Sequence, residues 1–471
     1  MNLSDDQANA LDRVEAWFKG APASTYCEGE HCEEEYPHTH GNAHGYPVLS
    51  IGGLAGSGKT WLTGQLAGVL GAEVAYGAPT HRAAAVLRGK LNESQALHVR
   101  TYHSLLYQAR ATYRCLRTMQ PLTVIPCGCP DPEECDCALR FEPCVQSADH
   151  TCQVHEDLKF TLRSAVGGRR DLIILDEASM VSEERVREIA SLGVPVLLVG
   201  DHGQLAPVKE EMNRWMKNPE IVLTTNHRQS DVTGIIGAAR HVRETGRLPL
   251  GTYGDGSTAC VSAALRPEVL AVASRDRLPP SPQHAIITHT NRMRAAVNHS
   301  YRDTPAHLAA PGMPVVGDRV VSLQNGDRVV VTPGEGIGRG EDGWRPSGAM
   351  EFVFNGSTGT IRSVRKLERP GQKWVTCVVE LDADRRGKSG CHVLTQLVVK
   401  QLGAEAKLAP NEYPDGRHLW DLAYALTAHK AQGSEFEKVV VLDTKPPEPR
   451  RWLYTAMTRA KSKLVVVNWN R

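Results

Sequence analysis

A glycine-rich segment offers the clearest chemistry in this chain of 471 residues. Residues 53–60 read GLAGSGKT and fit the pattern G-x-x-x-x-G-K-[ST], whose glycines let the backbone wrap around phosphate oxygens. The segment follows the apolar run Val48–Ile51 and precedes leucines spaced four residues apart, which predicts a strand, a loop and a helix. We expect Lys59 to contact the β- and γ-phosphates of ATP and Thr60 to hold Mg²⁺. The predicted ATP-binding residues of this loop are Gly53, Ala55, Gly56, Ser57, Gly58, Lys59 and Thr60.

An acidic pair follows a second apolar run. Residues 171–180 read DLIILDEASM, and the four apolar residues predict a buried parallel strand that ends at Asp176 and Glu177. Open α/β sheets bind their ligands at this end of the strands. We therefore expect Asp176 to hold Mg²⁺ and Glu177 to orient and deprotonate the attacking water. A solvated acidic turn is the alternative interpretation, and the presence of Lys59 favours the catalytic one.

Further apolar runs recur at the spacing of alternating strands and helices. They lie at residues 194–199, 221–223, 285–288, 439–442 and 464–467. This alternation predicts an α/β fold with two parallel sheets. Residues 311–416 interrupt it with Val, Gly and Asn-Gly turns between alternating strands, which predicts a small all-β insertion resembling an SH3-like barrel.

Composition limits the classes of protein to which the chain could belong. Its hydrophobic fraction of 41% and charged fraction of 23% are those of a soluble globular protein, and its length predicts two or three domains. No apolar run approaches the roughly 18 residues that cross a bilayer, and no signal peptide is apparent at residues 1–6, so we expect no membrane contact. A net charge of +1 gives no overall attraction to nucleic acid, which leaves a local basic groove as the means of binding it.

Cysteines and histidines gather in two segments. Seven of the twelve cysteines lie between Cys115 and Cys152. In a reducing compartment such clusters favour tetrahedral zinc over disulfides, and the count allows two zinc sites, one site with spare thiols, or free thiols in a loop. The predicted ligands there are Cys127, Cys129, Cys135, Cys137, Cys144, His150, Cys152 and His155. The second segment, which a flexible acidic and His-rich loop explains equally well, holds Cys27, His31, Cys32, His38, His40 and His44.

Eight segments, taken in order, resemble the motifs of superfamily 1 helicases. Residues 3–7 (LSDDQ), which resemble the Q motif, precede these eight segments. The P-loop and the acidic pair 176–177 resemble motifs I and II. The others are 78–84 (APTHRAA), 101–105 (TYHSL), 200–208 (GDHGQLAPV), 223–229 (LTTNHRQ), 425–435 (ALTAHKAQGSE) and 454–461 (YTAMTRAK). The HKAQG form and the β insertion, with its NGSTG at 355–359, are similar to the RecD/Dda-like 1B branch.

The resemblance implies an ATP-dependent DNA helicase with two RecA-like domains, translocating 5′→3′ on single-stranded DNA and unwinding forked duplex. It implies that Gln7 reads adenine, that Gln204 senses the γ-phosphate, and that Arg228 and Arg459 bring positive charge from the second domain. Arginine fingers of this kind are worth on the order of 10³–10⁵ in rate. The DNA contacts implied are Thr80, His81, Tyr102, Ser104, Thr427, His429 and Lys430.

The same resemblance predicts the domain boundaries. Residues 1–100 and 161–217 form the first RecA-like domain, with the Cys/His insertion at about 21–46, and residues 101–160 form the Cys-rich, pin-like insertion. Residues 218–310 and 417–471 form the second RecA-like domain around the SH3-like insertion at 311–416. We expect the zinc segment to fold the pin that splits the duplex, because it is too small to have a core of its own.

Two other functions stay open from the sequence. One is an RNA-directed helicase of the same branch, and the other is a zinc-bearing ATPase that acts as a switch or scaffold without unwinding. We expect a monomer in the cytoplasm or nucleoid of a bacterial or phage-infected cell. Replication or recombination proteins are its expected partners, while the pathway (replication, recombination or repair) is left open.

Overall fold

The computed structural model forms two compact units, Met1–Tyr102 with Arg169–Arg471, and His103–Gly168. It describes residues 3–20, 48–115, 121–122, 124–125, 140–141, 154–163, 170–207, 210–225, 233–263, 281–302, 304–333, 344–365, 374–382, 390–404, 407–408, 418–444 and 446–469.

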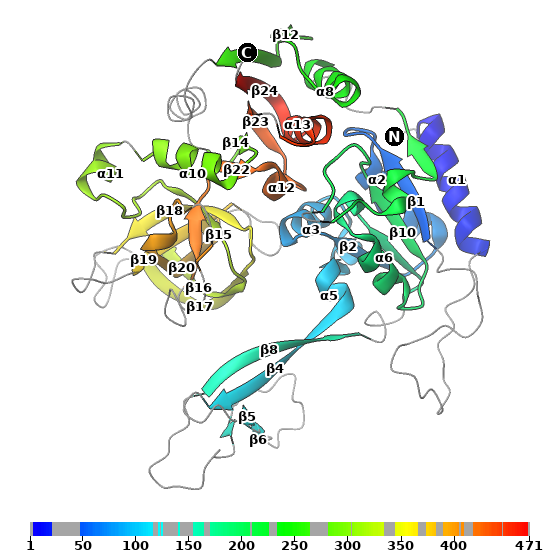
Figure 1. Ribbon diagram of the computed structural model, residues 1–471. Helices are drawn as coiled ribbons and strands as arrows, with labels where there is room; N and C mark the ends of the chain where they lie inside the picture. The colour runs from blue at the N-terminus through cyan, green and yellow to red at the C-terminus, as the bar shows by residue number, and fades with distance from the viewer. Residues whose placement is uncertain are drawn as a thin grey trace. The chain divides into compact units, whose positions relative to one another are not determined.

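The first sheet of the larger unit is parallel and has six strands in the order β11-β1-β10-β9-β2-β3 (Figure 1). These strands are β1 (Val48–Gly53), β2 (Val74–Ala78), β3 (Val99–Thr101), β9 (Leu172–Leu175), β10 (Val196–Gly200) and β11 (Ile221–Leu223). The predicted apolar runs are therefore confirmed as strands. Both faces of the central strands are buried, which explains why their sequences show no alternation of polar and apolar residues.

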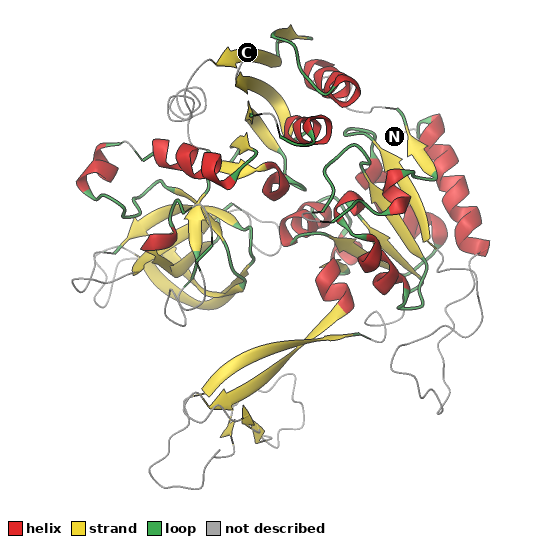
Figure 2. Ribbon diagram, viewed as in Figure 1, coloured by secondary structure: helices red, strands yellow, loops and turns green. Residues whose placement is uncertain are grey.

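Helices accompany this sheet, as the ribbon in Figure 2 shows. They are α1 (Asp5–Gly20), α2 (Lys59–Leu70), α3 (His81–Arg88), α4 (Glu93–Ala96), α6 (Glu183–Ala190) and α7 (Arg214–Lys217), with the 3-10 turn η1 (Ala178–Met180). Their apolar side chains form one core with the strands; Leu62 and Leu66 of α2, for example, are almost wholly buried. Side-chain caps fix several helix starts: the hydroxyl oxygen of Thr80 accepts a hydrogen bond from Ala83 N at 3.1 Å.

The second sheet also has six strands, in the order β12-β13-β24-β23-β14-β22. They are β12 (Gly251–Tyr253), β13 (Thr258–Ala263), β14 (His284–Thr288), β22 (Ala425–Thr427), β23 (Phe436–Asp443) and β24 (Ala460–Trp469). All neighbours pair in parallel except β12 and β13. Its helices are α8 (Thr233–Thr245), α10 (Asn291–Ser300), α11 (Pro305–Ala309), α12 (Ala428–Ala431) and α13 (Pro449–Met457).

A third sheet, antiparallel and seven-stranded, is formed by the part of the chain between strands β14 and β22 of the second sheet. Its order is β17-β16-β20-β19-β18-β15-β21. The strands are β15 (Arg319–Ser322), β16 (Gly326–Pro333), β17 (Trp344–Val353), β18 (Thr358–Val364), β19 (Trp374–Leu381), β20 (His392–Val398) and β21 (Trp420–Leu422), with the turn η2 (Val399–Gln401). Strand β21 lies beyond the predicted end of the β insertion at residue 416, because Trp420 and Leu422 are buried in the core of this sheet.

The smaller unit contains a long antiparallel pair. Strand β4 (Tyr107–Cys115) pairs with β8 (Val154–Leu162) from Tyr107 opposite Leu162 to Cys115 opposite Val154. It also contains the short strands β5 (Pro121–Leu122), β6 (Val124–Ile125) and β7 (Arg140–Phe141), and helix α5 (Tyr102–Leu106) leads into it. Of the predicted zinc ligands in this segment, only His155 lies in a described element, on β8.

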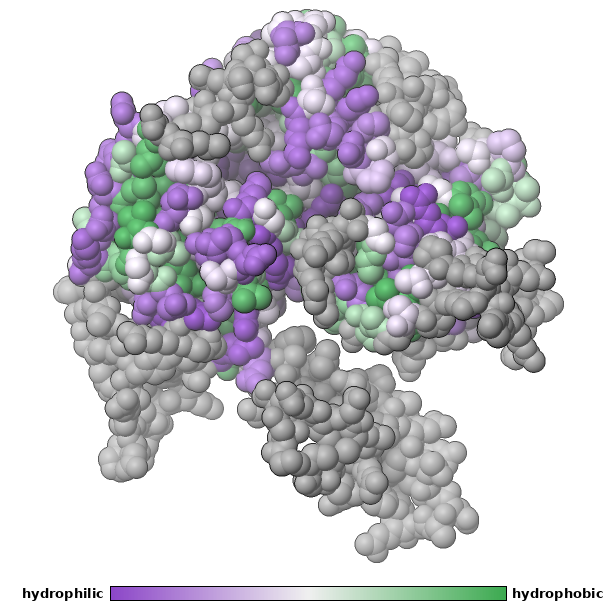
Figure 3. Space-filling model, turned by 180° about the vertical axis from the view of Figure 1, so that it is seen from behind, coloured by the Kyte–Doolittle hydropathy of each residue, from purple (hydrophilic) through white to green (hydrophobic). Residues whose placement is uncertain are grey.

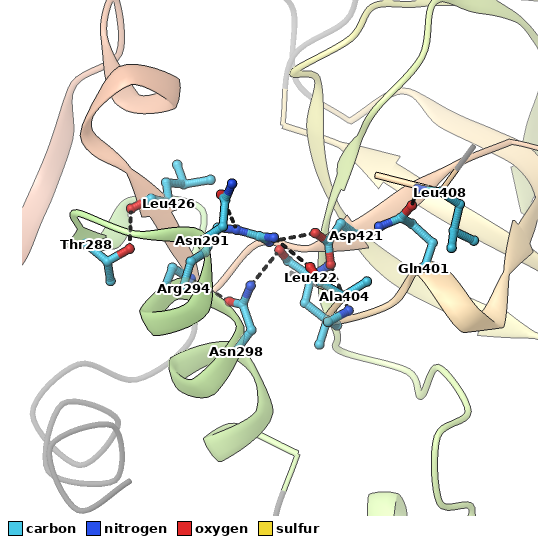
Figure 4. A network of polar contacts seen from close by, with 12 residues as sticks. Thr288, Asn291, Arg294, Asn298, Gln401, Ala404, Leu408, Asp421, Leu422 and Leu426 are labelled. Atoms are coloured by element: carbon cyan, nitrogen blue, oxygen red, sulfur yellow. Dashed lines mark hydrogen bonds and ion pairs between the residues drawn. The ribbon is translucent and has the colours of Figure 1, made fainter. Parts of the chain in front are cut away.

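A buried ion pair joins helix α10 to strand β21 (Figure 4). Arg294 Nη1 lies 2.6 Å from Asp421 Oδ2, and the two side chains are only 4% and 1% exposed. Arg294 Nη2 also donates to the Ala404 carbonyl at 2.7 Å, and Asp421 Oδ1 accepts from Gly403 N at 2.7 Å. Beside it, Asn298 donates to the Leu422 carbonyl and accepts from Ala425 N. The second and third sheets are thus joined by polar groups that satisfy one another.

On the face that Figure 3 shows, hydrophilic residues fill the centre and hydrophobic ones stand in separate groups. The large exposed hydrophobic side chains, such as Leu97, Leu308 and Val316, come from different elements or loops. Within the described part of the chain, none of the helices combines the length and hydrophobicity that crossing a membrane requires.

Substitution of Asp421 by Ala should lower the free energy of unfolding by about 3–5 kcal/mol, because it leaves the Arg294 guanidinium buried without its counter-charge. Urea titration followed by circular dichroism measures this. Glu380→Ala is the matched control on the third sheet, since it removes the more exposed Arg362–Glu380 pair and should cost less than about 1 kcal/mol. Equal effects of the two substitutions would contradict the structural role of the buried pair.

Candidate functional site

The predicted phosphate-binding loop lies between β1 and α2. Gly56 and Gly58 have φ values of 87° and 77°, a backbone conformation that side chains disfavour. A Cβ atom on Gly53 would lie 2.4 Å from Ser57 Oγ, so the loop has no space for a side chain there. The Lys59 ammonium donates to the carbonyls of Gly53 at 3.0 Å and Leu54 at 2.8 Å. Lys59 is therefore held by carbonyls of its own loop at the start of α2, the end of a helix that favours phosphate.

The acidic pair lies directly after β9, as predicted. Glu177 N donates to Asp176 Oδ1 at 2.9 Å. Glu177 has a φ of 53°, and among the described residues it is the one non-glycine residue with positive φ. Such strain persists where the surroundings fix the backbone, which often happens at functional sites. Burial, followed by the charge of Glu177, raises the pKa of the Asp176 carboxyl to about 6.

A pocket of about 310 Å³ brings these groups together with residues of the second sheet. From the first sheet come Ala55, Gly56, Gly58, Lys59, Thr60, Asp176, Glu177 and Gln204, and from the second come Gly433, Glu435, Thr458 and Arg459. Gln204 is 3% exposed, and its Oε1 atom has no hydrogen-bond partner. A buried acceptor without a partner, beside a loop that has no room for side chains, fits a bound nucleotide with its Mg²⁺ and water.

Tyr454 of α13 connects the two sheets at this pocket. Its hydroxyl donates to Asp201 Oδ2 at 2.6 Å and accepts from Ala55 N, in the phosphate-binding loop, at 3.1 Å. The next residue, Thr455, accepts from Leu205 N at 3.0 Å. Gln432 donates to the Leu205 carbonyl at 3.3 Å. Sequence reasoning gave no role to Tyr454 or Asp201, although both lie inside segments that resemble helicase motifs.

The next residues to place are the two arginines predicted to bring positive charge to the γ-phosphate and Gln7, which was predicted to read adenine. Arg459 is 5% exposed, lines the pocket, and donates to the carbonyls of Thr455 and Ser434. Arg228 lies outside the described residues. Gln7 is buried on α1, where its Oε1 accepts from Ser4 N, and it does not line the pocket.

Two of the residues predicted to contact DNA lie at the start of α3. Thr80 caps this helix, and the His81 ring stacks on Phe354, the residue after β17, with 3.8 Å between the ring centres. Burial lowers the pKa of His81 to about 4, so this imidazole is neutral at pH 7. The ring can accept a hydrogen bond from a nucleic-acid strand or donate one to it, but it carries no charge.

The predicted residues of the second sheet lie at the end of β22 and in α12, and they are Thr427, His429 and Lys430. Burial lowers the pKa of His429, and the charge of His289 adds to the effect. Removal from solvent and the neighbouring charge of Arg294 lower the pKa of the Lys430 ammonium.

Tyr102 and Ser104 lie in α5. The Tyr102 ring is 7% exposed, and its hydroxyl donates to the backbone carbonyl of Asp176. The structure therefore places Tyr102 beneath the acidic pair, where its ring offers no face on which a base could stack. Ser104 belongs to the smaller unit.

The predicted zinc ligands are not brought together in the described part of the chain. Cys27, Cys32, His38, His40 and His44 lie outside it, and so do Cys127, Cys129, Cys135, Cys137, Cys144, His150 and Cys152. Within the described residues, no group of three or more His, Cys, Asp or Glu side chains could hold a metal ion.

Fold and pocket define the class of protein: an α/β P-loop NTPase whose phosphate-binding loop lies on a parallel sheet. Residues 41–257 match the model of an AAA domain, and residues 422–467 match the model of the UvrD-like helicase C-terminal domain. Both matched segments contain motifs on which the resemblance to superfamily 1 helicases rests, and they support that resemblance.

Several solved structures are similar at low identity. Two coordinating Pif1 helicases at forked double-stranded DNA give 16% identity and a TM-score of 0.47, with 99% of this chain and 92% of that chain covered. Pif1 helicase from Candida albicans gives 16% and 0.46, with 100% and 95% covered. Bacteroides Pif1 bound to single-stranded DNA gives 16% and 0.44, with 99% and 92% covered. No curated protein sequence matches the chain.

The Asp176 carboxyl should make stability depend on pH. Because its pKa is raised from 3.8 to about 6, the folded state holds this proton more tightly than the unfolded state does. Between these values stability falls as pH rises, and the contribution should amount to roughly 1–3 kcal/mol. Urea titrations of the metal-free protein at about pH 5 and about pH 7.5 test this against Asp176→Asn, which cannot titrate. A difference between the two proteins that does not change with pH would contradict the prediction.

Proposed function

We propose that the protein is an ATP-dependent DNA helicase that translocates 5′→3′ on single-stranded DNA and unwinds duplex. The observation that carries the proposal is the composition of the pocket. Lys59 and Glu177 line it from the first parallel sheet, and Arg459 lines it from the second. A site divided between two sheets allows ATP hydrolysis to depend on how they come together.

The residues of the pocket suit phosphoryl transfer to water. Lys59 binds the β- and γ-phosphates, and Thr60 and Asp176 hold Mg²⁺, which neutralises charge on the phosphates. Glu177 orients the attacking water and takes its proton. Gln204 senses the γ-phosphate by donating from its Nε2 atom, while its unpartnered Oε1 atom can accept from the attacking water. Arg459, with Arg228, stabilises the charge that develops on the transferred group.

Nucleotide binding would change the contacts between the two sheets. A phosphate in the loop would compete with the Gly53 and Leu54 carbonyls for the Lys59 ammonium, and with the Tyr454 hydroxyl for Ala55 N. The Tyr454 hydroxyl also donates to Asp201, so the change at Ala55 N reaches α13. From there Thr455 connects to Leu205, and Leu205 to Gln432, next to the helix that carries His429 and Lys430. This chain of contacts supports a coupling between ATP and the strand.

The strand contacts proposed are Thr80, His81, Ser104, Thr427, His429 and Lys430, all acting without reading sequence. Tyr102 is better assigned to supporting Asp176. We keep residues 1–100 and 161–217, and 218–310 and 417–471, as the two RecA-like domains. Residues 101–160 are the proposed pin, and the third sheet is the proposed SH3-like insertion.

Strand displacement with Mg²⁺-ATP tests the function and the polarity together. Duplexes that carry only a 5′ tail should be displaced, those with only a 3′ tail should not, and Lys59→Ala should abolish displacement because it removes the phosphate contact. Preference for the 3′ tail would contradict the polarity. Failure on both tails, with ATP hydrolysis that single strands stimulate, would favour a switch or translocase. Stimulation by RNA alone would favour the RNA-directed enzyme.

Zinc in the pin-like segment has a separate test. We expect metal analysis of the purified protein to find zinc, and Cys135→Ser with Cys137→Ser to lower the zinc content because the site loses two thiolate ligands. The double variant should lose duplex unwinding and keep its ATP hydrolysis on single strands. The Cys260→Ser control should keep both activities, because Cys260 is buried on β13, outside the cysteine-rich segment. Unchanged unwinding by a zinc-free protein would contradict the proposal.

A further inference from the structure

A buried asparagine lies against the segment that follows the acidic pair, although it belongs to none of the motif segments. Asn213 precedes helix α7, and its exposed fraction is 0%. Its side-chain nitrogen donates to the Ala178 carbonyl at 2.9 Å and to the Val181 carbonyl at 2.8 Å. Its side-chain oxygen accepts from Met216 N at 2.9 Å and so caps α7. One carboxamide therefore joins the start of a helix to two carbonyls of an earlier part of the chain.

The two carbonyls mark the ends of the turn η1. Ala178 is the first residue of this turn and directly follows Glu177, whereas Val181 is the first residue after it. An amide nitrogen carries two hydrogens, and Asn213 has a carbonyl for each of them. The backbone that leaves Glu177 is thus held by a side chain from a different segment.

The packing around Gly200, at the end of β10, shows how little room this turn has. A Cβ atom on Gly200 would lie 3.1 Å from Ala178 N, 3.1 Å from Ser179 N and 2.8 Å from Met216 Sδ. The end of β10, the turn η1 and helix α7 therefore meet with little space for even one methyl group. Close packing of this kind resists a shift of the turn.

Other contacts hold the chain before the acidic pair. Asp176 N donates to the Gly77 carbonyl at 2.8 Å, and the Tyr102 hydroxyl donates to the Asp176 carbonyl. Glu177 follows with its φ of 53°, a left-handed conformation that is strained for a residue with a side chain. Such a conformation persists where the surroundings fix the backbone. Asn213 supplies a contact of this kind on the side that follows Glu177.

We propose that Asn213 is a positioning residue for ATP hydrolysis, which fixes the turn after Glu177 and thereby aims the Glu177 carboxylate at the attacking water. The inference rests on the proposed function, which assigns that water to Glu177. Asn213 is not among the described residues that line the nucleotide pocket, so it acts through the backbone of the turn. Misplacement of a catalytic group by about 1 Å can lower a rate on the order of 10²-fold.

Substitutions that keep the cap of α7 test the proposal. Asn213→Asp has the same shape and Asn213→Ser adds no charge; each retains an oxygen that can accept from Met216 N, and neither can donate to both carbonyls. In both variants kcat of ATP hydrolysis, measured without nucleic acid, should fall by about 10- to 100-fold. The dissociation constant of a fluorescent, non-hydrolysable ATP analogue should change by less than about twofold, because the phosphate-binding loop is intact.

Asn298→Ser is the matched control for Asn213→Ser. Asn298 is also 0% exposed, and its amide donates to the Leu422 carbonyl and accepts from Ala425 N, between α10 and the strands β21 and β22. This variant should lower the free energy of unfolding, as Asn213→Ser does, and keep the basal rate of hydrolysis. Equal losses of rate in the two variants would show a general structural effect and overturn the proposal.

A double-mutant cycle shows whether Asn213 acts through Glu177. Glu177→Gln should lower the single-turnover rate, and addition of Asn213→Ser should lower it by less than about a further twofold, because the carboxylate that Asn213 positions is already gone. Losses that multiply would overturn the proposal while the proposed function stands.

Failure of the proposed function gives a different result. A wild-type protein that hydrolyses ATP but displaces no strand would contradict the proposed function, and the cycle, which measures hydrolysis alone, would still decide the role of Asn213. A wild-type protein that hydrolyses no ATP would contradict both.

Discussion

The nucleotide pocket depends on one hydroxyl group. Tyr454 OH holds both the Ala55 amide of the phosphate-binding loop and the Asp201 carboxylate, although Tyr454 is 399 and 253 residues away from them in the chain. Burial, then the charge of Asp201, raises the pKa of this phenol well above its usual value, so it stays protonated and can donate. Because Ala55 N is one of the groups that a phosphate would bind, the ligand and the second sheet compete for it. That competition gives nucleotide binding a physical route to the other sheet.

Charge is arranged locally in this protein. The net charge of +1 gives no general attraction to a polyanion. The imidazoles of His81 and His429 have lowered pKa values and act as neutral groups, mainly because they are buried. Among the strand contacts that we propose, Lys430 would then provide the electrostatic part of binding.

Local patterns explain what the sequence could predict. The phosphate-binding loop, the acidic pair and several strands of the parallel sheets are each encoded within about ten consecutive residues, and the sequence predicts them. The predicted strands are β1, β9, β10, β11, β14, β23 and β24, whereas no apolar run was predicted at β2, β3, β12, β13 or β22. The sequence did not predict contacts between residues that lie far apart in the chain. The Arg294–Asp421 pair and the Tyr454 link join segments that only the fold brings together. The third sheet likewise includes β21, because the burial of Trp420 is a property of packing that turn signals do not reveal.

The rate of ATP hydrolysis with and without single-stranded DNA tests the central claim most directly. If the pocket between the two sheets is completed through the Tyr454 link, the rate should rise severalfold with oligothymidylate and reach a plateau as the strand saturates. Tyr454→Phe should keep basal hydrolysis and lose most of the stimulation, because the phenyl ring fills the same space without the hydroxyl. Hydrolysis that is indifferent to the strand in the wild-type protein, or stimulation that Tyr454→Phe leaves intact, would contradict this account.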